Sequence, residues 1–166
     1  MDFSENLNGK TVAFMVAAGF NETEFSELQR RLVKSGVRLT TIAAESGVVN
    51  GWQPSTASWG HYHPVDKSLA DTLAADIDIL VVPGGSKGIA KLSQNLHAKR
   101  ILAHAVDGLV PVVLFGDATE LLAAAERSAD VNVMSVSDLS DENWTDSVLA
   151  HMGNDFFAAE EARQAA

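Results

Sequence analysis

The 166-residue chain contains no cysteine, which excludes disulfide bonds, thiolate metal sites and a catalytic thiol. It is also poor in basic residues, since 12 Lys and Arg stand against 22 Asp and Glu, for a formal net charge of −10. That balance disfavours nucleic acid and anionic membranes as partners, because both need a basic surface. No apolar run approaches the length of a transmembrane helix. The first ten residues are polar and acidic, so we expect a cytoplasmic protein with no membrane partner.

Buried β-type runs alternate with amphipathic helical segments along the chain. The apolar pattern predicts strands at 11–17, 38–43, 77–82, 110–115 and 131–136, and helices at 21–35, 96–107, 119–125 and 144–157. This order predicts a flavodoxin-like three-layer α/β/α sandwich with a mostly parallel sheet. We expect one domain over 1–166, with 1–9 and 158–166 as peripheral tails.

Three turns follow the carboxyl ends of predicted strands, which is where ligands bind in such sheets. They span 18–24, 83–88 and 116–120. The third turn has the form of a nucleophile elbow, in which a strained corner residue points at substrate beneath a helix N-terminus. The corner residue here is Gly116, which offers no reactive atom. The sequence therefore predicts an elbow without covalent chemistry.

Glu24 and Asp117 each allow two interpretations. The stretches 21–24 and 117–120 both have the spacing of a capping box, in which the first side chain and the fourth each bond the other's backbone amide. The alternative is an acid–base pair at the mouth of a pocket, because two neighbouring carboxylates drive one pKa upward. Capping is favoured, since it explains both residues without a substrate.

Residues 45–67 are predicted to form an irregular excursion from the compact domain, a kind of segment that is often functional. His61 and His63 alternate within it, so both rings would point to one side as a partial Zn²⁺ or Cu²⁺ site, although pocket-wall histidines are the favoured interpretation. Large aromatic side chains favour a subunit contact in a two-fold homodimer, or else a lid over the pocket. These aromatic residues are Trp52, Trp59 and Tyr62.

Three motifs carry a family resemblance: GKTVAFMVAAGFNETEF, DIDILVVPGGSKG and VPVVLFGDATELLAAA. In order and spacing they resemble the ThiJ/PfpI family of the class I glutamine-amidotransferase-like superfamily, from Gly9 to about Ala125. The segments GDATELL, PVDKSLAD and WTDSVLAHMGNDFF are most similar to the carboxy-terminal domain of large-subunit catalases, which also lacks the elbow cysteine. The resemblance implies a flavodoxin-like fold with a pocket, a dimer, and no thiol catalysis. We expect no cofactor.

The resemblance also implies positions for the site. It places Glu24 on the family's thiol-contacting acid, Gly116 on its cysteine and Asp117 on its histidine. The turn that lends backbone donors falls on Gly84 and Gly85, and we expect these two residues and Glu120 to contact a ligand.

The leading hypothesis is a non-catalytic binding or assembly module that takes a small-molecule ligand. Two alternatives remain open. One is a cysteine-independent hydrolase or lyase that uses Glu24 and Asp117 as acid and base. The other is a metal-dependent activity through His61 and His63.

Overall fold

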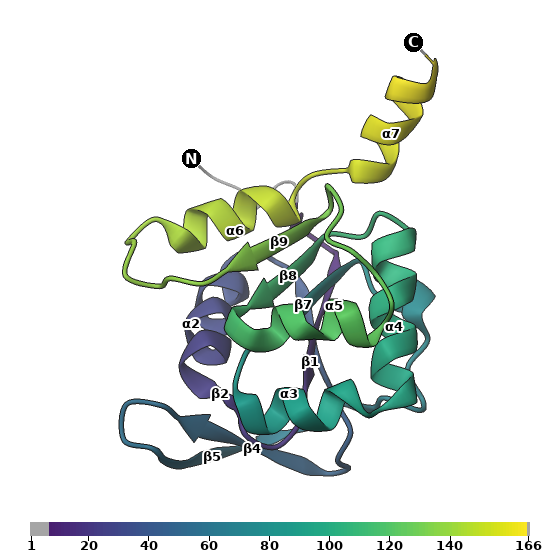
Figure 1. Cartoon of the computed structure of the whole chain (residues 1–166). Helices are drawn as coiled ribbons and strands as arrows, with labels where there is room; N and C mark the ends of the chain where they lie inside the picture. Colours follow the sequence, from purple (N-terminus) through teal and green to yellow (C-terminus); the bar gives the residue numbers. More distant parts are fainter. Residues whose placement is uncertain (1–6, 166) are drawn as a thin grey trace.

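The main sheet has six strands, in the order β6-β3-β1-β7-β8-β9, in a computed structural model that describes residues 7–165. Every neighbouring pair in it is parallel. The strands are β1 (Thr11–Val16), β3 (Arg38–Ala43), β6 (Lys67–Ser68), β7 (Ile79–Val82), β8 (Val112–Phe115) and β9 (Val133–Val136). The predicted α/β fold with a mostly parallel sheet is confirmed (Figure 1).

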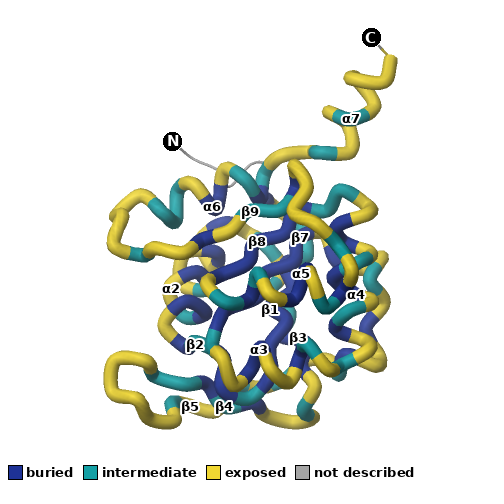
Figure 2. The backbone as a smooth tube through the Cα atoms, in the orientation of Figure 1, coloured by how far each residue is buried: buried dark blue, intermediate teal, exposed yellow. Residues whose placement is uncertain are grey.

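Helices cover the sheet on both faces (Figure 1). One face carries α2 (Glu22–Val33) and α6 (Trp144–Met152), and the other carries α3 (Ser86–Ser93), α4 (Leu96–Asp107) and α5 (Glu120–Ala124). Two short 3₁₀ turns, η1 (Ala74–Asp76) and η2 (Gly116–Thr119), precede β7 and α5. The strands between these layers are the most deeply buried part of the chain (Figure 2).

The central strands are apolar at nearly every position because they face two cores. On β1, Ala13 and Met15 belong to the core under α3, α4 and α5, whereas Phe14 and Val16 belong to the core under α2 and α6. Successive side chains of a strand point to opposite faces, so a strand covered on both sides needs apolar residues throughout. This explains the continuous apolar runs from which the strands were predicted.

The irregular excursion predicted over 45–67 is wrong. That segment forms an antiparallel hairpin of β4 (Val48–Gln53) and β5 (Ser58–Pro64), and β2 (Phe20–Asn21) joins it in a second sheet of order β2-β4-β5. The register shifts between Asn50 and Trp52. The hairpin lies below the main sheet, and β5 is its exposed edge (Figures 1 and 2).

The single closing helix predicted over 144–157 is also wrong. Helix α6 ends at Met152 with Gly153 as its C-cap, and a separate helix, α7 (Phe156–Ala165), projects away from the body (Figure 1). None of the α7 residues is buried. In the amino-terminal stretch expected to be peripheral, Leu7 is buried in the core under α2 and α6, whereas residues 1–6 lie outside the described part. Within residues 7–165, no helix is long and apolar enough to cross a membrane.

Candidate functional site

The three turns predicted to carry function meet at the carboxyl edge of the main sheet. The Asn21 N–H donates to the Gly84 carbonyl at 2.7 Å, which ties the turn after β1 to the turn after β7. The Gly85 N–H donates to Asp117 Oδ1 at 2.8 Å, which ties the turn after β7 to the turn after β8. Hydrogen bonds therefore join three segments that are far apart in sequence into one site.

The corner at Gly116 has the backbone geometry that the elbow motif predicts. Its φ of +54° lies in the left-handed region, which is strained for most residues with a side chain. A Cβ added at Gly116 would meet no heavy atom within 4 Å, and the residue is exposed. The corner is thus open, and the chain places no side chain there.

Glu24 is not the partner that a capping box requires. Asn21 does cap α2, because its side-chain oxygen accepts from the Thr23 N–H at 3.1 Å and from the Glu24 N–H at 3.2 Å. The Glu24 carboxylate, however, accepts from the Gly84 N–H at 2.9 Å instead of reaching back to the Asn21 amide. Half of the predicted capping box is wrong, and Glu24 points into the site.

Asp117 is likewise not an N-cap. It lies within η2, where no side chain caps the turn, and α5 begins only at Glu120. Its carboxylate accepts from the Gly85 N–H across the site. Glu120 is exposed at the start of α5 and takes no part in the hydrogen bonds that join Glu24, Asp117 and the two glycines.

The two carboxylates flank one glycine. A Cβ on Gly84 would lie 2.8 Å from Asp117 Oδ1, 2.8 Å from the Phe115 carbonyl oxygen and 3.2 Å from Glu24 Oε1. A Cβ on Gly85, whose φ is +110°, would lie 2.6 Å from the Gly19 carbonyl oxygen. Both glycines are therefore required by close packing of the three turns, and not only by the turn itself.

The site holds a carboxyl group that titrates near neutrality. Glu24 is 7% exposed. Burial raises the pKa of Glu24 to about 7; the hydrogen bond from Gly84 opposes this shift, and the nearby Asp117 carboxylate adds to it. Ionisation of Glu24 thus costs free energy in the folded protein, because the charge is desolvated next to a second acid.

A second polar cluster, centred on Glu22, was not predicted from the sequence. Glu22 is 3% exposed beneath the β4–β5 hairpin. Its carboxylate accepts from the His61 N–H at 2.7 Å, His61 Nδ1 at 3.0 Å and His63 Nε2 at 3.0 Å, and also from Gln53 Nε2. Burial raises the pKa of Glu22, but hydrogen bonds from His63 and His61 outweigh it and hold the pKa below the usual range.

His61 and His63 are brought together, as their alternation predicts, but both bind the Glu22 carboxylate. The His63 ring also packs against Phe25, with ring centroids 5.0 Å apart, and against Phe20 at 5.5 Å. Among the described residues, no group of three or more His, Asp or Glu side chains could hold a metal ion. The structure thus gives these histidines a role in holding the hairpin on α2.

Two glycines of the hairpin are the sequence feature that could have indicated the Glu22 cluster. A Cβ on Gly51 would lie 2.7 Å from Glu22 Oε2, and one on Gly60 would lie 2.6 Å from the same oxygen. Only glycine lets the two strands pass this close to a buried carboxylate. A carboxylate at the first turn of α2, together with two glycines in facing strands, marks the contact.

Comparison with known proteins shows which family this chain matches. The DJ-1/PfpI family matches residues 10–149. General stress protein 18 of Bacillus subtilis (strain 168) is 31% identical over 77 residues, which are 46% of this chain and 42% of that protein. The chain therefore spans less than half the length of that curated relative.

Solved structures agree on the fold. A ThiJ/PfpI domain protein from Brachyspira murdochii superposes with a TM-score of 0.70 at 13% identity, covering 88% of this chain and 97% of that one. A two-domain protein with DJ-1/ThiJ/PfpI-like and ferritin-like domains from Anabaena variabilis gives 0.75 at 16% identity, covering 87% of this chain and 50% of that one. Because the family match spans most of the sequence and the fold agrees, this chain belongs to the DJ-1/PfpI family.

Proposed function

We propose that this protein is a non-catalytic DJ-1/PfpI-family module that binds a small molecule at the elbow without forming a covalent bond. The observation that carries the proposal is that the backbone donors of the glycine turn are already occupied. Glu24 accepts from the Gly84 N–H and Asp117 accepts from the Gly85 N–H. In addition, the elbow corner is Gly116, which has no side chain that could act as a nucleophile.

Acyl-transfer chemistry needs free backbone N–H groups aimed at a developing negative charge, together with a nucleophile. Here the side chains of Glu24 and Asp117 would have to move away from the Gly84 and Gly85 amides before an oxyanion could bind there. The Asp117 carboxylate beside that position would also repel the oxyanion. The open space at Gly116 nevertheless leaves room for a ligand atom where the family's thiol would stand. These features support binding over turnover.

A second candidate function is supported by the pKa of Glu24. A carboxyl group with a pKa of about 7 beside a second carboxylate is suited to exchange protons with a bound substrate at neutral pH. This would be a hydrolase or lyase that needs no covalent intermediate.

We expect the protein to show no turnover in peptidase, deglycase and glyoxalase assays. The assays should compare wild type, Glu24→Gln, Asp117→Asn and the distant Glu27→Gln variant. A rate that survives repeated purification and falls only in the Glu24→Gln and Asp117→Asn variants would establish the acid–base alternative and end the non-catalytic proposal.

Gly116→Cys should produce a fast-reacting thiol. The new Cβ fits, and the amides of η2 together with a protonated Glu24 can stabilise a thiolate, which is the reactive form. The measurement is the rate of alkylation by iodoacetamide at neutral pH, with Ser46→Cys in an exposed bend as the matched control. Equal rates in the two variants would show that the elbow does not activate a nucleophile.

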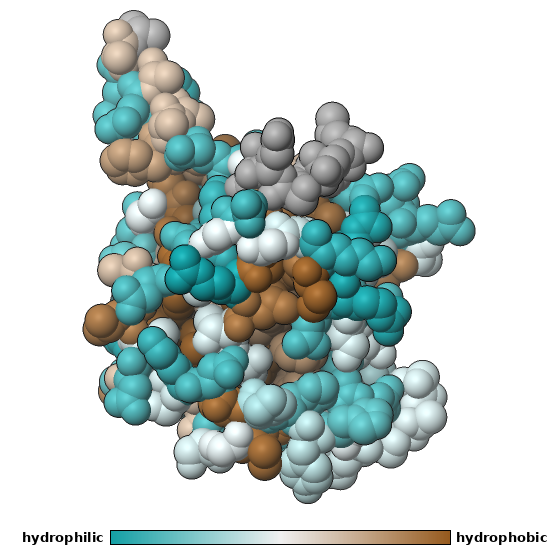
Figure 3. All heavy atoms as spheres, turned by 180° about the vertical axis from the view of Figure 1, so that it is seen from behind, coloured by the Kyte–Doolittle hydropathy of each residue, from teal (hydrophilic) through white to brown (hydrophobic). Residues whose placement is uncertain are grey.

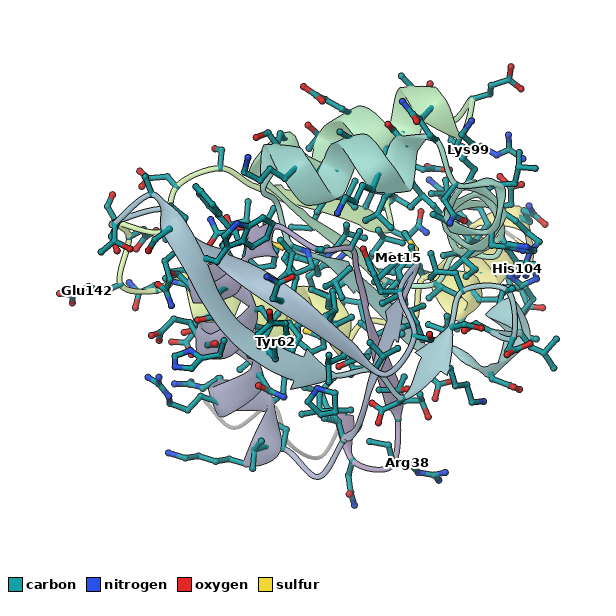
Figure 4. All side chains as sticks on the ribbon, turned by 90° about the horizontal axis from the view of Figure 1, so that it is seen from below. Met15, Arg38, Tyr62, Lys99, His104 and Glu142 are labelled. Carbon is teal, nitrogen blue, oxygen red and sulfur yellow. The ribbon has the colours of Figure 1, made fainter. Side chains whose placement is uncertain are left out.

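We also propose a homodimer built on the hairpin. Trp59 and Tyr62 of β5 are 51% and 70% exposed, and large aromatic side chains carry much of the energy of protein interfaces. Tyr62 lies on the hairpin as seen from below (Figure 4). Light scattering at micromolar concentration should give twice the monomer mass, and Trp59→Ala should lower it. A monomer mass for the wild type would refute the dimer, whereas an unchanged dimer in Trp59→Ala would place the interface elsewhere.

A further inference from the structure

A cavity of about 420 Å³ opens beside β3 and the short edge strand β6, away from the elbow. It is lined by Thr11 at the amino end of β1, by Thr40 on β3 and by Thr72 from the segment before η1, among others. The elbow lies at the carboxyl ends of the strands, so this cavity is a separate feature. Its volume lies within the range of small-molecule sites.

Beside this cavity, one face of the sheet changes from apolar to polar side chains. On the face that α3, α4 and α5 cover, Ala13 and Met15 of β1 and Ile42 of β3 are buried in the core. The same face carries Thr11 on β1, and Arg38 and Thr40 on β3, toward the amino ends of these strands. Because alternate residues share a face, polar residues here replace apolar ones on a face that is otherwise core. Seen from behind, the surface of the molecule carries hydrophobic patches beside hydrophilic ones (Figure 3).

The cavity is positively charged in a chain that is strongly acidic. Arg38 and Lys67 line it, and among the described residues Asp76 is the one acidic residue in its lining. Within residues 7–165, neither Arg38 nor Lys67 forms an ion pair. The Arg38 side chain extends outward from the sheet edge (Figure 4). With a net charge of −10 for the whole chain, two unpaired cations on one cavity make it a local site for an anion.

The walls of the cavity are fixed by hydrogen bonds. Asp66, next to Lys67, accepts from the Thr41 N–H at 2.7 Å and donates its own N–H to the Thr41 carbonyl at 2.9 Å. On the other rim, Arg100 Nη2 donates to the Thr72 carbonyl at 3.1 Å and to the Leu69 carbonyl at 3.3 Å. Preformed walls lower the entropy cost of binding.

We propose that this cavity binds a small organic anion, a carboxylate or phosphate group carried on a short apolar body. Arg38 and Lys67 would hold the anionic group, since cations bind carboxylate and phosphate through charge-assisted hydrogen bonds. The apolar body would pack against Ile42, Leu73 and Ile77, which also line the cavity. Leu73 is 64% exposed, an apolar side chain that a ligand would cover.

An added peptide strand fits this edge less well. β6 and Asp66 already pair with Thr41, Ile42 and Ala43 on the outer side of β3. Outside these pairings, Leu39 is the residue of β3 whose backbone faces the open side. One residue is too few for strand addition, because that mode of binding depends on a row of backbone hydrogen bonds.

The test is an NMR titration of the full chain with benzoate, phenyl phosphate and neutral benzamide. We expect at least one of the two anions to shift the amide signals of Thr11, Thr40 and Thr72, and the more tightly bound anion identifies the preferred acid. Benzamide should bind about tenfold more weakly or not at all. The double variant Arg38→Gln with Lys67→Gln should weaken anion binding at least about tenfold.

The matched control is Arg30→Gln with Lys34→Gln, which makes the same charge change at the carboxyl end of α2 and should bind the anions as wild type does. Equal loss in both double variants would show general charge attraction and overturn the proposal. So would equal binding of benzamide, or no shift with either anion. Signals at the cavity that move with protein concentration alone would assign it to a second copy of the chain, which also overturns the proposal.

Discussion

Glu24→Gln should gain stability relative to wild type as the pH rises from about 4 to about 8, by a total of roughly 3 kcal/mol in the free energy of unfolding. The pKa of Glu24 is raised from 4.5 to about 7 in the folded protein. Each unit of pKa difference between the two states corresponds to about 1.4 kcal/mol. Glutamine keeps an oxygen for the Gly84 N–H and carries no charge, so its stability has no such pH dependence.

The sign follows from which state binds the proton more tightly. Below pH 4.5 the Glu24 carboxyl is protonated in both states, and its contribution to stability is fully present. Between pH 4.5 and 7 the unfolded chain releases the proton while the folded protein retains it, so stability falls as the pH rises. Above the folded pKa the loss is complete.

Denaturant unfolding of both proteins across this pH range measures the effect. Glu27→Gln is the control, because Glu27 lies on the same helix with its side chain 46% exposed and pairs with the exposed Arg30. It should follow the wild-type curve. Parallel curves for wild type and Glu24→Gln would mean that Glu24 ionises as freely in the folded protein as in the unfolded one, and would remove the support for an acid–base role.

The elements of the main sheet were predictable because their sequence pattern follows from burial. β3 and α4 have the bounds that their apolar patterns predict, 38–43 and 96–107. The hairpin was not predictable in this way, because β5 is mostly exposed, with only Gly60 and His63 half-buried, and buries no regular set of apolar residues. It contacts Glu22 through His61 and His63, which lie 39 and 41 positions further along the chain.

The candidate site shows the limit of local motifs. The spacing of Asn21 and Glu24 correctly predicts the Asn21 cap, because a cap involves only neighbouring residues. The partner of the Glu24 carboxylate is the Gly84 amide, sixty positions away, and no local pattern specifies it. The turns themselves could be placed together, because parallel strands end at one edge of a sheet.

Removing the buried carboxylate by Glu22→Ala should destabilise the fold by about 1–3 kcal/mol, because the half-buried His63 and Gln53 side chains lose their hydrogen-bond acceptor. His61, His63 and Gln53 all donate to this one group. Glu22→Gln should be nearly as damaging, since its amide N–H₂ would face other donors. The expected local effect is loss of hydrogen-exchange protection across β4 and β5 before the main sheet opens.

The wild type should show the same weakness in acid. The pKa of Glu22 is lowered, so the stability it contributes is present above pH 4.5 and is lost as the pH falls through the lowered pKa. Glu27→Ala, on the exposed side of the same helix, is the control and should leave the hairpin protected. Gln53→Ala removes a single donor and keeps the test usable if Glu22→Ala does not fold. If β4 and β5 in Glu22→Ala keep wild-type protection, packing of Phe20 and Phe25 on His63 holds the hairpin, and the carboxylate does not.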